Sequence, residues 1–510
     1  PASSEPSVRD APVLVFVQSA SHYGRCDGKG CQPTGSPGPS ATGLISMRFL
    51  CCLLAFAAAS MARGGPPVVV LIVGDDLGYA ELGCYGQKII QTPALDLMAR
   101  EGTRFTAYRS GAPVCAPSRC CLLTGKHSGH AAIRNNREMK PAGQEPLPPG
   151  IETIASLFKA RGYATAAAGK WGLGTQENDG DPLKRGFDHF TGYYCQRHAH
   201  NHYPSFLFVD GAKVPQPGNT DGDTGATWSQ DVFEKQALDW LERHKDKALF
   251  LFLPVIVPHV ALQAPEDAIA PYLGKFDDPP YPGNKGYRKH PRPRAAYAAM
   301  ISRFDRMVGR VIDRLRRQGR ENDALVMVTS DNGPTHDGVG GADCEFFKSA
   351  GGLRGMKGSV YEGGIRVPLL AWGPGRVRAG AVSDIDCYAP DIFATLAEAA
   401  GAAAPGTDGI SLMPTLSGKG TRPSHKAMYW EFPGYGGQQA ILSGGLKLVR
   451  TKLASKAPKT ELFDLAKDPG EKDDLAPSRP DDVARLLKLA ASQRTPSGLF
   501  KFPALDNPLP

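Results

Sequence analysis

The sequence lacks a strong net charge, and it lacks an apolar run long enough to cross a membrane. Over 510 residues, 59 Lys and Arg face 51 Asp and Glu, which leaves a formal charge of +8. The basic residues are scattered, apart from the short run RLRRQGR, which we interpret as the solvated end of a helix. We therefore expect neither a nucleic-acid partner nor a membrane span.

Cysteine pairs at zinc-binding spacing are also missing. The 11 cysteines include no CxxC pair and no CxxC–HxxxH pattern, which argues against a structural zinc site. After the four in the first 62 residues are set aside, an odd number remains, so one thiol is expected to have a task other than a disulfide. The remaining cysteines are Cys84, Cys115, Cys120, Cys121, Cys195, Cys344 and Cys387. The sequence does not determine their pairing.

The first 62 residues differ from the rest of the chain. Residues 1–46 contain no Met and are rich in Ser, Gly and Pro, so we expect a segment that is disordered or not translated. Residues 47–62 read MRFLCCLLAFAAASMA, with a basic residue, a short apolar run and then small residues. That order is typical of a secretory signal peptide, with a buried N-terminal helix as the alternative. We therefore expect a secreted or periplasmic protein.

Apolar strands alternate with amphipathic helices from residue 66 to about residue 420. This pattern predicts an α/β domain whose large, mainly parallel sheet is flanked by helices. VVVLIV at 68–73 is typical of a central strand buried on both faces, and an apolar stripe predicts a long helix over 297–318. Short strand candidates between 421 and 510, followed by the helical pattern DDVARLLKLAASQ, predict a C-terminal subdomain with a small antiparallel sheet.

Several predicted strands end in polar clusters. Asp75 and Asp76 follow one buried strand, and Asp331 and Asn332 follow another. Because parallel strands place their carboxyl ends along one edge of a sheet, these side chains are expected to converge. Their hard oxygen ligands suit Ca²⁺ or Mg²⁺ better than Zn²⁺. For either pair alone, an ordinary turn or helix cap is the alternative.

Basic side chains close to a hard cation indicate an anionic substrate. Lys170, Lys357 and Arg119 could supply two point charges and a guanidinium fork to a tetrahedral oxyanion. Hydrolysis of a phosphate or sulfate ester follows as a hypothesis. Taken alone, each lysine is more often a solvated surface residue.

Five stretches resemble the motifs of one enzyme family, in its order. CAPSRCCLLTG at 115–125 resembles the first signature of the formylglycine-dependent sulfatases, C-x-P-S-R-x-x-L-x-T-G, at every fixed position. GYATAAAGKWG at 162–172 resembles the second signature, and GDDLGYAELGCYG, TSDNG and KGSVYEGGIRVP also match the family. The resemblance extends from about residue 66 to the C-terminus. It implies the alkaline-phosphatase-like fold and an arylsulfatase type of activity.

The resemblance implies that Cys115 is a precursor and not the final nucleophile. A formylglycine-generating enzyme would read Cys115, Pro117 and Arg119 in the unfolded chain and oxidise the side chain of Cys115 to an aldehyde, 3-oxoalanine. Hydration would give a geminal diol. One hydroxyl would attack sulfur and expel the alcohol, and the second would collapse the sulfated hemiacetal and release sulfate. Cys120 and Cys121 are expected to pack within a helix.

The resemblance also assigns roles to individual residues. One calcium ion would lower the pKa of the diol and hold a sulfate oxygen. Arg119 would hold the diol and the metal carboxylates, Lys170 and Lys357 would bind sulfate, and His259 would bind sulfate and assist the leaving oxygen. The implied calcium ligands are Asp75, Asp76, Asp331, Asn332 and the modified Cys115.

One position departs from the family. The family usually has K-W-H-L-G where this chain has Lys170-Trp171-Gly172-Leu173-Gly174, and the missing imidazole is commonly assigned as the base of the collapse step. Another histidine, a water molecule or weak activity could account for the glycine. We expect His198, His200 and His202 to contact substrate, and these or His127 and His130 to replace the base; loop hydrogen bonding is the alternative for each.

The sequence therefore predicts a sulfuric ester hydrolase acting on a sulfated carbohydrate or aryl sulfate. Its insertion at 195–230 is polar and fits a sugar better than a lipid. A phosphodiester or phosphonate monoester hydrolase on the same scaffold is the nearest alternative. A catalytically weak protein that binds sulfated polysaccharide is the other, because of Gly172.

Overall fold

The computed structural model describes residues 65–140, 143–284 and 286–506. The expected upstream segment, 1–46, and the expected signal peptide, 47–62, lie outside these residues. Among the helices of the described part, none has both the length and the apolar character needed to cross a membrane.

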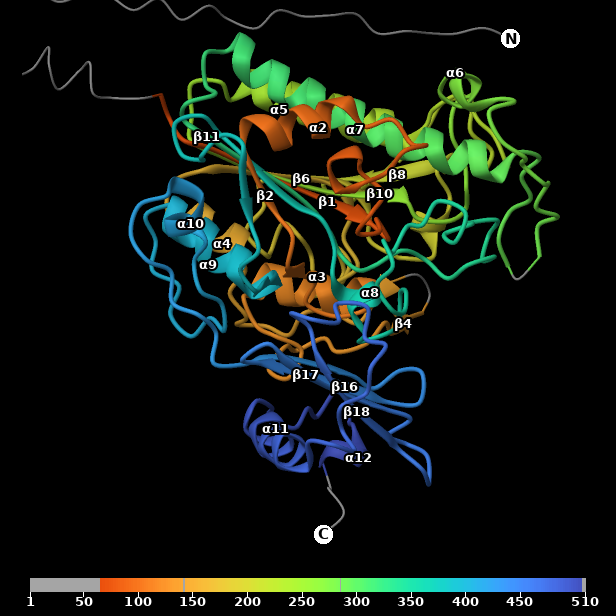
Figure 1. The fold of residues 1–510 in the computed structure, drawn as a ribbon. Helices are drawn as coiled ribbons and strands as arrows, with labels where there is room; N and C mark the ends of the chain where they lie inside the picture. Colours follow the sequence, from red (N-terminus) through yellow and green to blue (C-terminus); the bar gives the residue numbers. More distant parts are fainter. Residues whose placement is uncertain (1–64, 141–142, 285, 507–510) are drawn as a thin grey trace, which may run out of the picture. The chain divides into compact units, whose positions relative to one another are not determined.

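Ten strands form one sheet in the order β13-β2-β12-β11-β1-β10-β6-β7-β8-β9 (Figure 1). The central strands β11, β1, β10, β6 and β7 run parallel, whereas the pairings of β12, β8 and β9 are antiparallel. The predicted α/β class with a mainly parallel sheet is confirmed. The strands are β1 Val68–Asp75, β2 Thr103–Phe105, β6 Ala164–Lys170, β7 His189–Tyr193, β8 Phe206–Val209, β9 Ala212–Pro215, β10 Leu249–Pro258, β11 Ala324–Ser330, β12 Leu369–Trp372 and β13 Ala381–Ser383.

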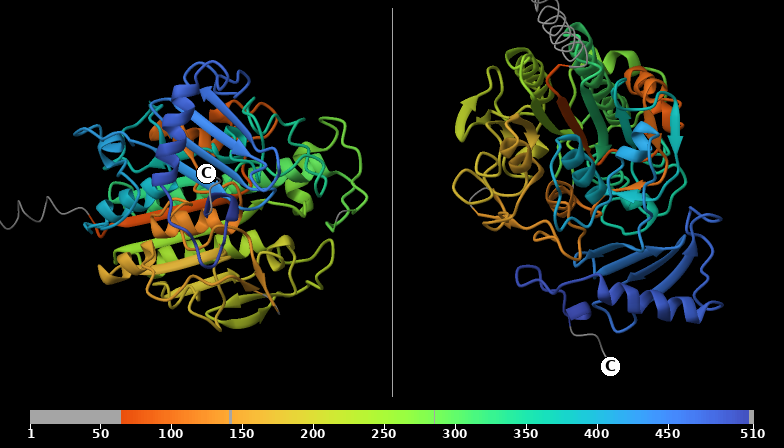
Figure 2. Two further views of the ribbon diagram at one scale, coloured as in Figure 1. Left: turned by 90° about the horizontal axis from the view of Figure 1, so that it is seen from below. Right: turned by 90° about the vertical axis from the view of Figure 1, so that its left-hand side faces the viewer.

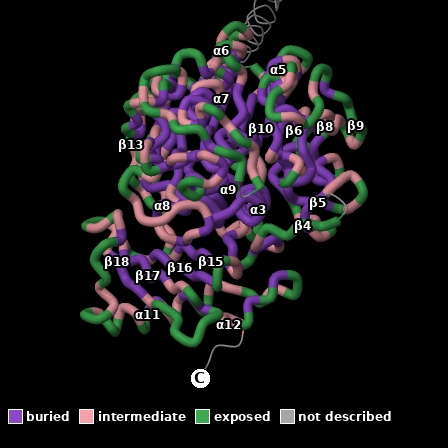
Figure 3. Tube along the Cα trace, turned by 90° about the vertical axis from the view of Figure 1, so that its right-hand side faces the viewer, coloured by how far each residue is buried: buried purple, intermediate pink, exposed green. Residues whose placement is uncertain are grey.

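Helices cover both faces of this sheet (Figure 1). Val68, Val70 and Ile72 of β1 share one core cluster with α2, α5 and α7, while Val69 and Leu71 share the other with α3, α4 and α9. Because side chains alternate across a strand, a strand covered on both sides is apolar at every position. The central strands are buried along their length (Figure 3). The helices are α2 Pro93–Glu101, α3 Cys115–Thr124, α4 Ile154–Ala160, α5 Ser229–Arg243, α7 Pro293–Arg317, α9 Ala389–Ala399 and α10 Met413–Ser417.

Among the described residues the longest helix is α7, which begins at Pro293. Its apolar stripe predicts a beginning at residue 297 instead. Pro293 occupies the first turn, where its missing N–H costs no hydrogen bond. The carboxylate of Asp278 accepts from the backbone N–H groups of Arg294 and Ala295 at 2.7 and 2.9 Å. This cap comes from a distant loop, so the apolar periodicity alone could not reveal it.

A four-stranded antiparallel sheet lies near the C-terminus, with α11 (Pro480–Ser492) packed on one face (Figure 2). Its other face packs against Val114, Val360 and Ile365 of the preceding part of the chain. The predicted small sheet with a closing helix is confirmed, and the subdomain boundary near residue 420 stays a prediction. The strands are β15 Met428–Phe432, β16 Gln438–Ser443, β17 Leu446–Thr451 and β18 Lys459–Asp464.

Shorter elements connect these layers. The helical turns are η1 Gly83–Tyr85, η2 His198–His200, α6 Glu266–Ile269, η3 Ala270–Tyr272, α8 Glu362–Ile365 and α12 Pro503–Asp506. The short strands are β3 Tyr108–Arg109, β4 Glu138–Met139, β5 Gly143–Gln144 and β14 Cys387–Tyr388.

Candidate functional site

The carboxyl ends of four parallel strands meet the beginning of helix α3. Asp75 ends β1, Lys170 ends β6, His259 follows β10 and Asp331 follows β11. Cys115 is the first residue of α3, where the positive end of the helix dipole favours an anion. The predicted convergence of polar strand ends is therefore present in the structure. The side chains brought together are Asp75, Asp76, Cys115, Arg119, Lys170, His259, Asp331, Asn332 and Lys357.

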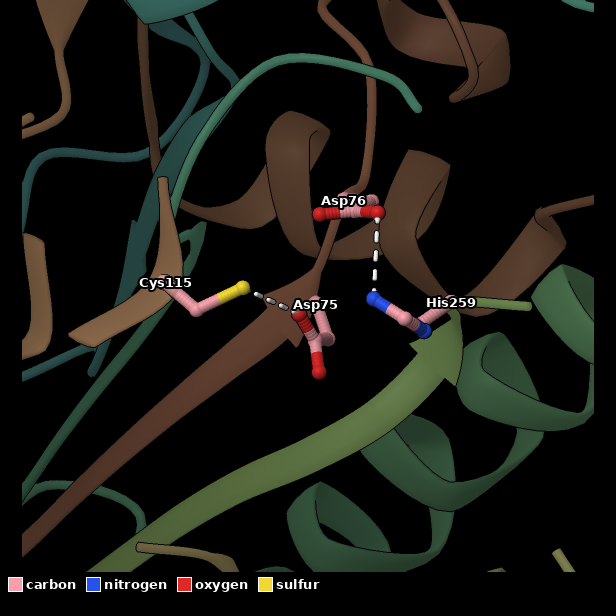
Figure 4. Close-up of side chains that lie close together, drawn as sticks. All are labelled: Asp75, Asp76, Cys115 and His259. Atoms are coloured by element: carbon pink, nitrogen blue, oxygen red, sulfur yellow. Dashed lines mark hydrogen bonds and ion pairs between the residues drawn. The ribbon is translucent and has the colours of Figure 1, made fainter. Parts of the chain in front are cut away.

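Asp75, the last residue of β1, and Asp76, which follows it, lie at the centre of this group (Figure 4). Possible ligand atoms of Asp75, Asp76, Cys115 and His259 all lie within 4.8 Å of one another. The thiol Sγ of Cys115 is 3.5 Å from Oδ1 of Asp75, and Nε2 of His259 is 3.6 Å from Oδ2 of Asp76. All four side chains are buried.

Each central aspartate is paired with a lysine. Nζ of Lys170 lies 2.7 Å from Oδ2 of Asp75, and Nζ of Lys357 lies 2.8 Å from Oδ1 of Asp76. Burial by itself would raise the pKa of Asp75, but Lys170 and the other cations nearby hold that pKa well below its ordinary value. Burial likewise opposes the charge on Lys170, yet Asp75 keeps its pKa raised. Both partners are therefore charged at neutral pH.

Arg119 connects the helix to the acidic cluster. Its Nε and Nη2 atoms lie 3.0 and 2.9 Å from Oδ2 of Asp331, and Nη1 donates to the carbonyl of Lys170. Burial and the nearby Asp75 raise the pKa of Asp331 to about 6, with Arg119 only partly compensating. Burial is the main cause of this raised pKa, and the negative charge of Asp75 adds to it.

The donor set fits a hard cation. Asn332 donates through Nδ2 to Oδ1 of Asp76 at 2.7 Å, while its buried Oδ1 has no hydrogen-bond partner among the described residues. A buried, unpaired amide oxygen beside three carboxylates is an arrangement that Ca²⁺ or Mg²⁺ would satisfy. Asp75, Asp76 and Asp331 would supply the carboxylate oxygens.

Two other histidines, His200 and His202, contact His259. Its Nδ1 is bonded to the carbonyl of Val260, which leaves Nε2 facing Asp76. The ring of His200 stacks on it with centroids 4.7 Å apart, and Nε2 of His202 lies 3.1 Å from its carbonyl oxygen. Burial and then Lys357 lower the pKa of His259 well below its ordinary value.

The other predicted histidines lie away from the acidic cluster. His198 packs against Tyr193 and Phe206, with ring centroids 4.9 and 4.6 Å away. His127 and His130 stack on each other beside Asp408, on the loop that follows α3. Of the five predicted histidines, only His200 stacks on a ring of the acidic cluster in the described structure. Burial, His259 and Lys170 lower the pKa of His200 to about 2, so its ring is neutral.

Gly172 adopts a backbone conformation that favours glycine, with φ of +78°. A Cβ added there would lie 3.3 Å from Nε2 of Gln196. Gln196 donates to Oδ1 of Asn136 at 3.3 Å, and the same oxygen accepts from the backbone N–H of Ala116 at 3.0 Å. The sequence analysis missed Asn136 and Gln196, because no motif links them to Cys115.

The cysteines of the described residues are all free thiols. Burial raises the pKa of Cys115 to about 12, although Lys170 and Lys357 oppose this shift. Cys120 and Cys121 are buried in the core cluster that α3 shares with α4 and α9, which confirms their predicted packing role.

Comparison with known proteins gives matches over most of the chain. A family model described as Sulfatase matches residues 67–402, and one described as N-sulphoglucosamine sulphohydrolase, C-terminal, matches residues 356–491. The N-acetylgalactosamine-6-sulfatase of Canis lupus familiaris is 32% identical over 396 residues, covering 72% of this chain and 69% of its own. The steryl-sulfatase of Mus musculus is 30% identical over 451 residues, covering 73% and 69%. The solved structure of Ps i-CgsB in complex with k-i-k-neocarrahexaose superposes with a TM-score of 0.67 at 25% identity, covering 84% and 93%.

Proposed function

Because the chain belongs to the sulfatase family and is a sulfuric ester hydrolase, we propose that it removes sulfate from carbohydrates with a nucleophile derived from Cys115. The observation that carries the proposal is the placement of Cys115 at the beginning of α3, 3.5 Å from Asp75 and close to the positive charges of Lys170 and Lys357. A thiol buried in this way is a poor nucleophile, because burial raises its pKa to about 12. Conversion by a formylglycine-generating enzyme would supply an aldehyde hydrate, with one hydroxyl to attack sulfur and one to let sulfate leave.

A calcium ion is the proposed metal. Asp75, Asp76, Asp331 and Asn332 would hold it, together with the modified Cys115. The ion would supply a positive charge that acidifies the nucleophile and stabilises the sulfate oxygens. The unpaired Oδ1 of Asn332 supports this assignment.

The remaining residues of the cluster bind and orient the substrate. Lys170 and Lys357 place two ammonium groups beside the central aspartates, where they can bind sulfate oxygens. Arg119, in the middle of α3, binds Asp331 and so helps to fix the position of Cys115 at the beginning of the helix. Because Nδ1 of His259 is bonded to the carbonyl of Val260, Nε2 is the atom that can exchange a proton with the leaving oxygen.

Gly172 has no side chain that could act as the base when the sulfated hemiacetal collapses. His200 is close to His259, but its pKa of about 2 makes it a poor proton acceptor. We therefore assign His200 to substrate contact and leave the base at this step to solvent. His202 supports His259 through its carbonyl, and His198 packs among aromatic rings, so neither is proposed to touch substrate.

The carbohydrate assignment rests on relatives and on polarity. One relative is named N-acetylgalactosamine-6-sulfatase, and one structural neighbour was solved with a neocarrahexaose. The segment 195–230 is rich in polar residues. Export by the segment 47–62, to the periplasm or the medium, belongs to the same proposal.

Replacing Cys115 tests the mechanism. We expect Cys115→Ala to abolish sulfate release from 4-nitrophenyl sulfate and from N-acetylgalactosamine 6-sulfate. Cys120→Ala, a buried thiol of the same helix, is the matched control and should keep the activity. Retained activity in Cys115→Ala would favour a metal-hydroxide mechanism. Faster release from a phosphonate monoester than from any sulfate ester would favour the alternative enzyme, and binding of sulfated polysaccharide without release would favour a silent binding protein.

A further inference from the structure

An exposed aromatic ring lies in the loop between β15 and β16. Tyr435 is 65% exposed, the largest value among the exposed large hydrophobic side chains of the described residues. Its φ of +51° is unfavourable for a residue with a Cβ, so the surrounding loop must impose this backbone conformation. Phe432 packs against it edge to face, with centroids 5.5 Å apart. The ring therefore contacts Phe432 while most of its surface faces solvent.

The same loop is fixed against the segment that carries Lys357. A Cβ added to Gly358 would overlap the ring of Tyr435, so the ring covers the residue that directly follows Lys357. Gln438, at the beginning of β16, accepts from the backbone N–H of Val360 at 3.2 Å and donates to the carbonyl of Gly358 at 2.6 Å. These two bonds tie the Tyr435 loop to the Lys357 segment.

A second exposed ring lies on the other side of this contact. The centroid of His336 is 6.0 Å from that of Tyr435, and its side chain is exposed. The backbone N–H of Lys357 donates to the carbonyl of Pro334 at 2.9 Å, which holds the His336 loop beside Lys357. Burial and Lys357 lower the pKa of His336, so at neutral pH its ring can both donate to and accept from a hydroxyl.

Lys357 is the more accessible of the two lysines of the site. Its side chain is 12% exposed, whereas that of Lys170 is 0% exposed. Consider a substrate whose sulfate enters the acidic cluster past Lys357. The rest of that substrate, which is bonded to the sulfate, would then lie beside Tyr435 and His336.

We propose that Tyr435 and His336 form a subsite for the sugar ring that carries the sulfate ester. This inference rests on the proposed function and deepens it by identifying where the carbohydrate binds. The apolar C–H face of a pyranose can pack on the Tyr435 ring, whose two free torsions cost little entropy on binding. A hydroxyl of the same sugar can hydrogen bond to His336. Neither inorganic sulfate nor a sulfate ester without a ring could use these contacts.

Steady-state kinetics of the whole protein test the subsite. The substrates are N-acetylgalactosamine 6-sulfate, N-acetylglucosamine 6-sulfate and 4-nitrophenyl sulfate, with inorganic sulfate as a competitive inhibitor. We expect Tyr435→Ala to raise KM for the preferred sugar sulfate about five- to tenfold, with kcat changed by less than about twofold. The inhibition constant of inorganic sulfate should stay the same, and Tyr435→Phe should restore the KM. Val382→Ala, which alters a side chain of similar exposure on β13, is the surface control.

Four outcomes would contradict the subsite. An unchanged KM for every sugar sulfate in Tyr435→Ala would show that the ring makes no useful contact. An equal change in the inhibition constant of sulfate would show that Tyr435 acts only through the position of Lys357. Activity of the unaltered enzyme on 4-nitrophenyl sulfate, but on no sugar sulfate, would overturn the carbohydrate assignment and the subsite while leaving the sulfatase chemistry. Absence of sulfate release from all substrates would overturn the proposed function and the subsite with it.

Discussion

Lys170 and Asp75 form an ion pair of 2.7 Å whose two side chains are no more than 1% exposed. Such a pair is costly to break, because removing one partner leaves a buried charge without compensation. The pair also lies beside Cys115, whose thiol is 3.5 Å from the same aspartate. The charge balance of the fold and the chemistry of the site therefore depend on the same two residues.

Lys170→Met is expected to lower both activity and stability. The buried carboxylate of Asp75 loses its strongest cation, so we expect the free energy of unfolding to fall by about 3–5 kcal/mol. Sulfate release from 4-nitrophenyl sulfate should become undetectable. Lys159→Met is the control, because Lys159 forms a half-exposed pair with Asp188 and should cost less than about 1 kcal/mol. Urea unfolding checks both values, and equal losses in the two variants would contradict the prediction.

Removal of a bound cation is expected to destabilise the protein. The acidic cluster crowds three carboxylates, and burial with Asp75 already raises the pKa of Asp331 to about 6. A chelator should therefore lower the Tm and stop sulfate release, and added Ca²⁺ should restore both. Asn332→Ala should weaken calcium binding by about tenfold, whereas Asn322→Ala, at an exposed position, should not. An unchanged Tm after complete metal removal would argue against the calcium site.

Gly172 and Gly162 offer a matched pair for backbone strain. Their φ angles are +78° and +77°, but a Cβ on Gly172 would meet Gln196 at 3.3 Å, whereas one on Gly162 would meet nothing within 4 Å. Each Gly→Ala change should cost about 1–2 kcal/mol of unfolding free energy through the left-handed backbone. Only Gly172→Ala should also alter kcat, since Gln196 is linked through Asn136 to the beginning of α3. A kinetic effect of the same size in Gly162→Ala would remove that explanation.

Buried His198 predicts how stability depends on pH. Burial lowers its pKa to about 4, whereas an unfolded chain has the ordinary value near 6.5. As pH falls from about 6.5 to 4, His198 binds a proton in the unfolded state but not in the folded state. The free energy of unfolding therefore decreases across this pH range. His198→Phe should reduce that loss by about 1–3 kcal/mol. Above pH 7, the free energy of unfolding should change with pH as it does in the unaltered protein. Unfolding curves at pH 7.5, 6 and 5 check this, and parallel pH profiles for the two proteins would contradict it.

Much of the fold could be predicted from the sequence because its signals are local. An uninterrupted apolar run identified β1, and turn-forming residues after it marked the end of the strand. Parallel strands then place their ends at one edge, so Asp75 and Asp331 could be expected together although 256 residues separate them in the chain. The beginning of α7 was wrong by four residues because its cap, Asp278, is not adjacent to the helix.

The supporting residues of the site could not be predicted in the same way. Gln438 bonds to Gly358 across 80 positions, and this contact depends on how the C-terminal sheet packs against the segment that contains Val360 and Ile365. Asn136 and Gln196 likewise meet only through folded loops. The histidine-rich stretch shows the opposite problem. Its composition did not reveal that, of its three histidines, only His200 stacks on the ring of His259 in the described structure.

Mass spectrometry of the tryptic peptide that contains Cys115, from protein made in its native host, tests the proposed nucleophile most directly. We expect a peptide in which the CH₂SH side chain has become an aldehyde or its hydrate, together with sulfate release by the same preparation. An intact thiol at Cys115 in a preparation that releases sulfate would contradict a nucleophile derived from Cys115.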